Sequence, residues 1–250
     1  MPLNYARRLT GRQREAGGNR QLGLLLALVA GAANAGGFVA VHQYTSHMTG
    51  IVSAMADDVA AGGLRLAAAG LGALAAFVAG AACCALIVGF ARRRGLHSIY
   101  ALPLLFEAVL LLSFGVLGAQ LASVEVLIVP ATVALLCFMM GLQNAVITKV
   151  SNAEIRTTHI TGVMTDIGIE LGKALYPNAH DLAAPRVTAN VERLRLLAAL
   201  ALCFFVGGLV GAAGFAQLGY AATVPLALVL VMLAIVPVVD DLRRRPQTGV

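Results

Sequence analysis

The same polar hexapeptide occurs twice in this chain, as TSHMTG at residues 45–50 and as TTHITG at residues 157–162. Each copy carries an imidazole, at His47 and His159, and imidazole can gain or lose a proton near neutral pH. Each copy also follows an apolar stretch with one asparagine, Asn34 or Asn144, whose amide can donate and accept hydrogen bonds. Matched groups of this kind could bind a polar ligand or shuttle protons.

Hydroxyl groups recur at a spacing of four residues in both copies. If the segments 45–61 and 157–175 form helices, these hydroxyls share one helix face. The rows are Thr45, Thr49 and Ser53 in the first copy and Thr157, Thr161 and Thr165 in the second. Such a row could line a water-filled path or bind a ligand. Alternatively, each hydroxyl bonds the carbonyl one turn earlier, as Ser and Thr within helices often do.

The elements that carry these phrases belong to a strongly apolar chain. It is 59% hydrophobic and 12% charged, with a mean hydropathy of +0.85, whereas a soluble domain has about 25% charged residues. A helix needs about 20 apolar residues to cross a bilayer. Runs of this length occur at about 22–43, 66–91, 99–119, 126–147, 194–215 and 219–239. We therefore expect an all-α, polytopic membrane protein with six transmembrane helices. The run from Leu22 is too long for a signal peptide, so we assign it to the first span.

The basic residues are distributed asymmetrically about these six runs. With six spans, 17 of the 18 Lys and Arg residues fall on one side of the membrane and only Arg65 falls on the other. By the positive-inside rule, the side with the 17 basic residues is the cytoplasm. We expect a bacterial inner (plasma) membrane protein with cytoplasmic tails at residues 1–21 and 240–250. The net charge of +6 then requires no nucleic-acid partner, and the lipid bilayer is the expected environment.

Short matches beyond the hexapeptides occur in the same order in both halves. LRL at 64–66 matches 194–196, FVAG at 77–80 matches FVGG at 205–208, and PL at 103–104 matches 225–226. We therefore divide the membrane region into repeats at 22–121 and 122–239. Since each repeat has three spans, the second must enter from the opposite side. Inverted repeats are a recurring architecture of transporters, with sites where the halves meet; some channels use it too.

Ionisable side chains at membrane depth are costly and often mark ion or proton paths. Asp166 lies among apolar neighbours in the second short segment, so we include it in the candidate site. Glu107, two turns into the third run, is a weaker candidate. For Glu170, the alternative is an ion pair with Lys173 one turn on.

The two short segments are too short to cross the bilayer. We expect re-entrant or broken helices, because irregular backbone is tolerated where it lines a cavity; interfacial helices are the alternative. Glycines at 31, 36 and 37 also predict bending or unwinding in the first span. An inward-pointing helix N-terminus would favour an anion, but the sequence does not determine which end points inward. The candidate binding residues are Asn34, Thr45, His47, Thr49, Ser53, Asn144, Thr157, His159, Thr161, Thr165 and Asp166.

The asparagine-containing first span, the phrase MTG at 48–50, the run GLQNA at 141–145 and the phrase TTHITG resemble the YoaK family of bacterial membrane proteins. The resemblance extends over about residues 22–240 and implies a six-span inner-membrane protein without an established activity. In that family the first phrase commonly continues Met-Thr-Gly-Asn. Ile51 replaces the asparagine here, so any contact made by that amide is absent or altered.

These observations favour a permease or carrier for a small polar solute or ion. A channel of the same architecture and a structural or regulatory partner of another membrane protein remain alternatives, and a homo-oligomer is compatible with each. An enzyme is the least expected class, because the chain lacks the H-E-x-x-H and G-x-S-x-G motifs. We expect no cofactor and no metal site, since the four cysteines lie in apolar runs without metal-ligand spacing.

Overall fold

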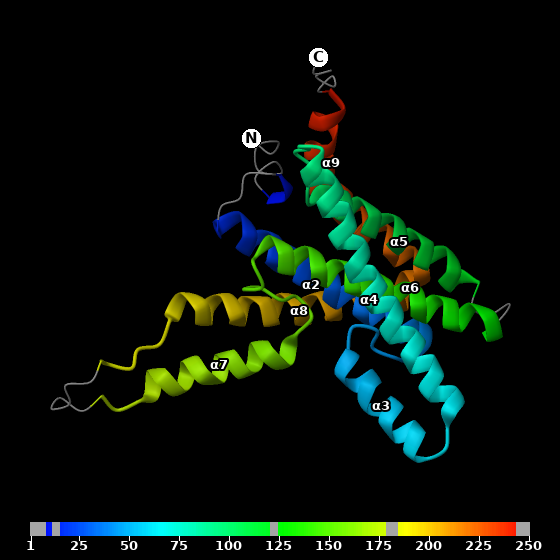
Figure 1. Cartoon of the computed structure of the whole chain (residues 1–250), viewed down its shortest axis with the longest axis horizontal. Coiled ribbons are helices and arrows are strands. Elements are labelled where there is room, and N and C mark those ends of the chain that lie inside the picture. Colours follow the sequence, from blue (N-terminus) through cyan, green and yellow to red (C-terminus); the bar gives the residue numbers. More distant parts are fainter. Residues whose placement is uncertain (1–8, 12–15, 121–124, 179–184, 244–250) are drawn as a thin grey trace.

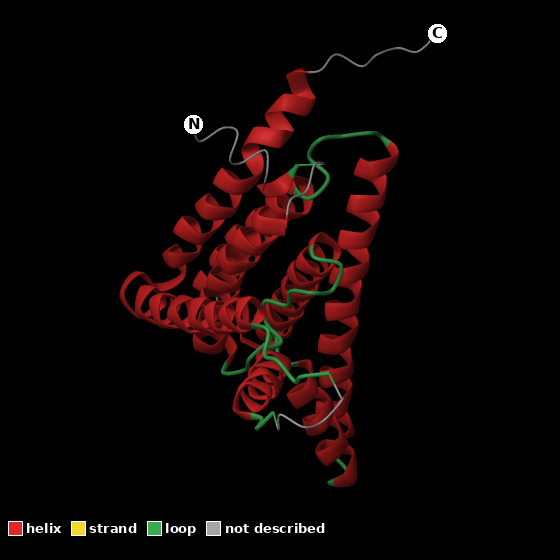
Figure 2. Ribbon diagram, turned by 90° about the vertical axis from the view of Figure 1, so that its left-hand side faces the viewer, coloured by secondary structure: helices red, strands yellow, loops and turns green. Residues whose placement is uncertain are grey.

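The computed structural model describes residues 9–11, 16–120, 125–178 and 185–243, and within these ranges the chain is helical with no β-strand (Figure 2). The main elements are α2 (Ala16–Val41), α3 (Met48–Ala60), α4 (Leu64–Arg93), α5 (Ala101–Ala119), α6 (Glu125–Val150), α7 (Ile160–Leu175), α8 (Val191–Leu218), the short 3₁₀ helix η1 (Gly219–Ala222) and α9 (Thr223–Arg243).

Each of the six predicted apolar runs lies mainly within one of the long helices α2, α4, α5, α6, α8 and α9, and the last run also includes η1. A helix satisfies its own backbone hydrogen bonds, which an apolar chain in lipid requires. The stretches long and apolar enough to cross a membrane are Gly17–Val41, Leu64–Arg93, Ala101–Ala119, Val129–Val150 and Val191–Arg243, the last of which comprises α8, η1 and α9. These helices indicate a multi-pass membrane protein.

The predicted tails are only partly within the described residues. Helix α2 begins at Ala16, inside the tail predicted for 1–21, and α9 extends to Arg243, inside the tail predicted for 240–250. Residues 9–11 of the first tail are also described, and the Thr10 hydroxyl donates to the Leu233 carbonyl of α9 at 2.8 Å. The other residues of both tails lie outside the described residues. So does the predicted boundary between the repeats, at 121 and 122.

Helices α2 and α8 approach each other so closely that backbone meets backbone. A Cβ added at Gly31 would collide with the carbonyl oxygen of Phe204, and one added at Gly207 would collide with that of Leu28. Small residues allow this approach, which stabilises helix pairs in lipid through van der Waals contact. The glycines at 31, 36 and 37 lie within a continuous helix, so the predicted unwinding of the first span is wrong. Gly31 serves helix packing.

Helices α4 and α6 make the corresponding contact. A Cβ at Gly141 would collide with the carbonyl oxygen of Phe77, and one at Gly80 with that of Phe138. The two crossings correspond residue by residue. Gly141 and Phe138 on α6 each lie 110 positions after Gly31 and Leu28 on α2, and Phe204 and Gly207 on α8 each lie 127 positions after Phe77 and Gly80 on α4. The structural counterpart of Phe77 is therefore Phe204, one residue before the one that sequence matching selects.

The short helices extend the same pattern. Helix α3 packs against α4 and α7 packs against α8, so each follows one long helix and lies along the next (Figure 1). Helices α5 and α9 pack against each other. The side chains buried around them include Leu104, Leu111, Phe114 and Leu230, which belong to the main apolar core.

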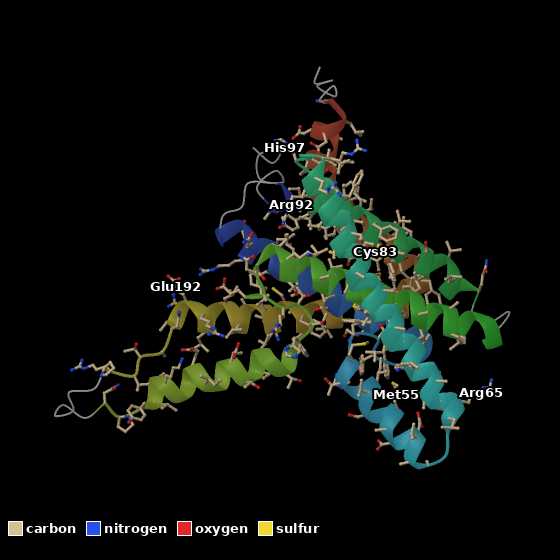
Figure 3. All side chains as sticks on the ribbon, viewed as in Figure 1. Met55, Arg65, Cys83, Arg92, His97 and Glu192 are labelled. Atoms are coloured by element: carbon tan, nitrogen blue, oxygen red, sulfur yellow. The ribbon has the colours of Figure 1, made fainter. Side chains whose placement is uncertain are left out.

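The end of α9 is tied to the turn between α4 and α5, near the labelled residues Arg92 and His97 in Figure 3. The Asp241 carboxylate accepts hydrogen bonds from the backbone N–H of His97 (2.9 Å), the backbone N–H of Ser98 (2.8 Å) and the Ser98 hydroxyl (2.6 Å). Arg65 marks the opposite end of α4, with Cys83 between (Figure 3).

Candidate functional site

The two asparagines make the same hydrogen bond in both copies of the motif. The Ser46 hydroxyl donates to Asn34 Oδ1 at 2.9 Å, and the Thr158 hydroxyl donates to Asn144 Oδ1 at 2.7 Å. Each bond joins a hexapeptide to the long helix that precedes it. The asparagine is therefore the anchor that holds the phrase against its helix.

Turns with left-handed residues return each phrase to its asparagine. After α2, the chain reverses at His42, whose φ is 52°. After α6, Asn152 and Ala153 have φ of 51° and 67°. Asparagine and histidine adopt this region more readily than most residues. The second turn is also closed by Ser151, whose hydroxyl oxygen accepts from the Ile155 backbone N–H at 2.9 Å.

The two histidines precede the first turns of the short helices. His47 is the N-cap of α3 and His159 the N-cap of α7, and neither side chain makes a capping hydrogen bond. A Cβ at Gly50 or Gly162 would collide with the imidazole, so glycine three residues on leaves room for the ring. Both histidines are exposed, and His159 Nδ1 lies 3.3 Å from Arg156 Nη1.

Both phrases line one cavity of about 1260 Å³. From the first copy it includes Asn34, Ser46, His47 and Thr49, and from the second it includes Asn144, Arg156, Thr158, His159 and Thr161. The rest of the wall is largely apolar and comes mainly from α2 and α8, with Phe38, Phe204 and Phe205 among its aromatic residues. A large apolar cavity with a few convergent polar groups is the usual form of a small-molecule site.

The electrostatic character of the cavity is positive. The N-cap and first-turn residues of both α3 and α7 lie at its wall, and a helix N-terminus carries roughly half a positive charge with unpaired N–H groups. Arg156 adds a full positive charge. Among the described residues that line the cavity, none is acidic.

Of the predicted site residues, Asn34, His47, Thr49, Asn144, His159 and Thr161 line this cavity. Thr45, Ser53, Thr157, Thr165 and Asp166 are not among its lining residues. Asp166 instead pairs with Arg193 of α8, at 2.9 Å between Oδ2 and Nη2. Asp166 therefore lies in an ion pair between α7 and α8 and not at the cavity wall.

The predicted hydroxyl rows are also wrong. Each short helix begins after its histidine, so Thr45 and Thr157 precede it and are buried at 1% exposure. Neither of their hydroxyls has a hydrogen-bond partner within the described part of the chain. Ser53 and Thr165 are exposed, and the Thr165 hydroxyl donates to the Thr161 carbonyl at 2.9 Å, the local bond expected of a helical threonine.

Sequence reasoning missed Ser46, Thr158 and Arg156. The second position of each hexapeptide is a hydroxyl residue in both copies, and this shared chemistry was the available signal. This signal did not identify the asparagine as the hydrogen-bond partner of the hydroxyl. The asparagine is 12 or 14 residues earlier in the chain, and only the geometry of the turn between the two residues shows that they meet. Arg156 has no basic counterpart in the first copy.

Glu170 forms the link between α7 and the start of α8. Its buried carboxylate accepts from the Asn190 backbone N–H at 2.7 Å and from Lys173 Nζ at 2.9 Å. The Asn190 hydrogen bond, followed by the bond from Lys173, lowers the pKa of Glu170 below its ordinary value. The ion pair proposed from the sequence as the alternative role is present.

The long apolar helices, with their exposed apolar faces, indicate a helical multi-pass membrane protein. The chain belongs to the family described as protein of unknown function (DUF1275), which matches residues 22–236. No curated protein and no solved structure is significantly similar to the chain. The family description assigns no activity.

Proposed function

We propose that this protein is a permease or carrier for a small polar solute or ion, with its substrate site in the cavity shared by the two hexapeptides. The observation that carries the proposal is the matched asparagine–hydroxyl pair: both pairs, built by segments 112 residues apart, lie at one cavity wall. Two separate surface motifs would have no reason to converge. We favour a transport role over catalysis and over a purely structural role.

We further infer that the six long helices span the membrane as two inverted halves. The α2–α8 crossing and the α6–α4 crossing use corresponding residues, and α3 and α7 occupy corresponding places beside α4 and α8. Two helices of the first half, α2 and α4, then pack against two helices of the second half, α8 and α6. This arrangement allows one half to rock against the other around a fixed site. The clustering of basic residues supports a bacterial inner membrane with both termini in the cytoplasm.

The charge of the cavity favours an anionic solute, in particular an organic carboxylate. Two helix N-termini and Arg156 surround the space, and a carboxylate is the group that backbone N–H donors and guanidinium recognise. The phenylalanine-rich remainder of the wall suits an apolar portion of the same solute.

Flux measurements in proteoliposomes test the proposal. The panel consists of membrane-impermeant carboxylates, ammonium compounds and uncharged polyols of matched size. We expect saturable uptake of carboxylates, reduced about tenfold or more by the double substitution Asn34→Ala with Asn144→Ala. Ser53→Ala is the matched control, because Ser53 is exposed on α3 and does not line the cavity.

A second comparison isolates the charge. Arg156→Gln should reduce carboxylate uptake more than polyol uptake, whereas Arg195→Gln, on α8 and away from the cavity wall, should change neither. Absence of saturable uptake for every class would reject the carrier. Non-saturating conductance through the wild-type protein would replace it with a channel.

A further inference from the structure

A carboxyl group lies buried in the helix core without the partners that a carboxylate needs. Glu107, on α5, has 0% exposure, and neither of its carboxyl oxygens has a hydrogen-bond partner among the described residues. A charged carboxylate in that position would bear the full cost of desolvation without an interaction that offsets it. A neutral carboxylic acid would not.

Gln143 of α6 supplies what a protonated carboxyl would need. It is fully buried and lies near Glu107, and its Oε1 also has no hydrogen-bond partner within the described chain. Its Nε2 donates to the carbonyl of Leu26 at 3.5 Å, which points the amide toward α2 as well. A proton on Glu107 would supply a donor for the orphaned Gln143 Oε1, because the carboxylic acid O–H could donate to it.

Both residues break the correspondence between the halves. The position that matches Gln143 on α2 is Ala33, and the position that matches Glu107 on α9, by the match of the two PL pairs, is Val229; both are apolar. A polar pair placed once, in a scaffold that otherwise repeats itself, is not a requirement of that scaffold. Gln143 is also the neighbour of Asn144, which lines the cavity.

Few other charged or titratable groups face Glu107. On α4, the buried Cys84 thiol interacts with Glu107, with Cys83 and with Lys149, and Lys149 itself is exposed near the end of α6. Helix α9 has no ionisable side chain before Asp240 and Asp241 in its last turns, and Tyr220 of η1 packs against Phe114. Within the described residues, none of the ion pairs involves Glu107.

We propose that Glu107 and Gln143 form an exchangeable proton site, and that a proton bound there is the coupling ion of transport. Binding adds a proton from water to one Glu107 carboxylate oxygen, and the new O–H donates to Gln143 Oε1. Release returns the proton to water and restores the carboxylate, with no electron transfer. Glu107 lies six residues after the start of α5, about 9 Å along the helix axis. A proton therefore has a short path between Glu107 and that end of the helix. The coupling role rests on the proposed carrier function, whereas the proton site does not.

Infrared difference spectroscopy tests the proton site without any solute. The full chain in phosphatidylethanolamine–phosphatidylglycerol nanodiscs is titrated with pH in H₂O and in D₂O. We expect a protonated-carboxyl C=O band at pH 7 that shifts in D₂O, disappears as pH rises and is absent from Glu107→Gln. Gln143→Leu should shift the frequency of the band without removing it, and Glu170→Gln should leave it unchanged.

The outcomes separate the two parts of the inference. No such band in the wild-type protein, or a band that neither exchanges in D₂O nor titrates, would overturn the proton site. If uptake is found, an imposed proton gradient should increase it in the wild-type protein and have no effect on Glu107→Gln; equal stimulation of both would overturn coupling. If no solute is taken up, the carrier proposal fails and coupling fails with it, while the infrared result still decides the proton site.

Discussion

At the residue scale, the asparagine–hydroxyl pairs are the feature that connects the sequence motif to a three-dimensional site. Asn144 is satisfied on both sides of its amide, since its Nδ2 donates to the Met140 carbonyl at 2.8 Å while its Oδ1 accepts from Thr158. Such an amide is fixed in orientation. It therefore presents a defined surface to the cavity rather than a mobile one.

The first prediction concerns the strength of this link. A double-mutant cycle of Ser46→Ala and Asn34→Ala should give a coupling energy of about 0.6 kcal/mol, the average for hydrogen bonds between membrane-protein helices. The free energy of unfolding is measured by SDS titration in mixed micelles. Ser46→Thr is the control, because it keeps the hydroxyl and reproduces the residue of the other copy. A coupling energy near zero would mean that the Asn34 bond does not hold the phrase.

At the element scale, the positions of the long helices follow from composition, because an apolar run of about 20 residues has few alternatives to a helix in lipid. The site was harder to predict. The hydroxyl rows required helices that begin at Thr45 and Thr157, but the Ser46 and Thr158 side chains bond asparagines on the preceding helix, so each helix begins only after its histidine. Long-range bonds of this kind leave no periodic trace in a sequence.

The second prediction concerns helix packing. Gly207→Ala should destabilise the protein by about 1–3 kcal/mol, because the new methyl group would collide with the Leu28 carbonyl oxygen and force α2 and α8 apart. Gly72→Ala is the matched control on the corresponding helix, where nothing lies within 4 Å. Alanine there should be neutral or stabilise by up to about 1 kcal/mol through helix propensity. Equal effects of the two substitutions, measured as unfolding free energies, would contradict the close contact.

The third prediction is a pH dependence of the α7–α8 connection. Because the folded-state pKa of Glu170 lies below its unfolded value, Glu170 contributes stability above the ordinary glutamate pKa of about 4.3. That contribution is lost as pH falls through the folded-state pKa. The Tm of Glu170→Gln should therefore lie below that of the wild-type protein at pH 7, and the difference should shrink at acidic pH. Glu154→Gln makes the same change of side chain on the exposed turn after α6 and is the control. If the difference in Tm between the wild-type protein and Glu170→Gln stays unchanged in strong acid, the charged form of Glu170 is not what joins α7 to α8.

At the scale of the whole molecule, the two arms formed by α3 with α4 and by α7 with α8 extend from the bundle in different directions (Figure 1). If the halves are inverted, the connections at the tips of these arms must lie on opposite faces of the membrane. The site between them would then be reached from one face beside α3 and from the other beside α7. This arrangement is what alternating access requires, and it is open to a direct measurement.

The fourth prediction tests the inversion by cysteine accessibility in a variant without the four native cysteines. Ala61→Cys, between α3 and α4, should react with a membrane-impermeant maleimide in intact cells, because Arg65 beside it is the one basic residue assigned to the outside. Thr188→Cys, between α7 and α8, should react only after the membrane is permeabilised. Arg94→Cys, at the α4–α5 turn, is the internal reference and should behave like Thr188→Cys. All three side chains are exposed, so differences in labelling report sidedness rather than burial. Labelling of Ala61→Cys and Thr188→Cys from the same side would exclude inverted halves, and with them the rocking of one half against the other.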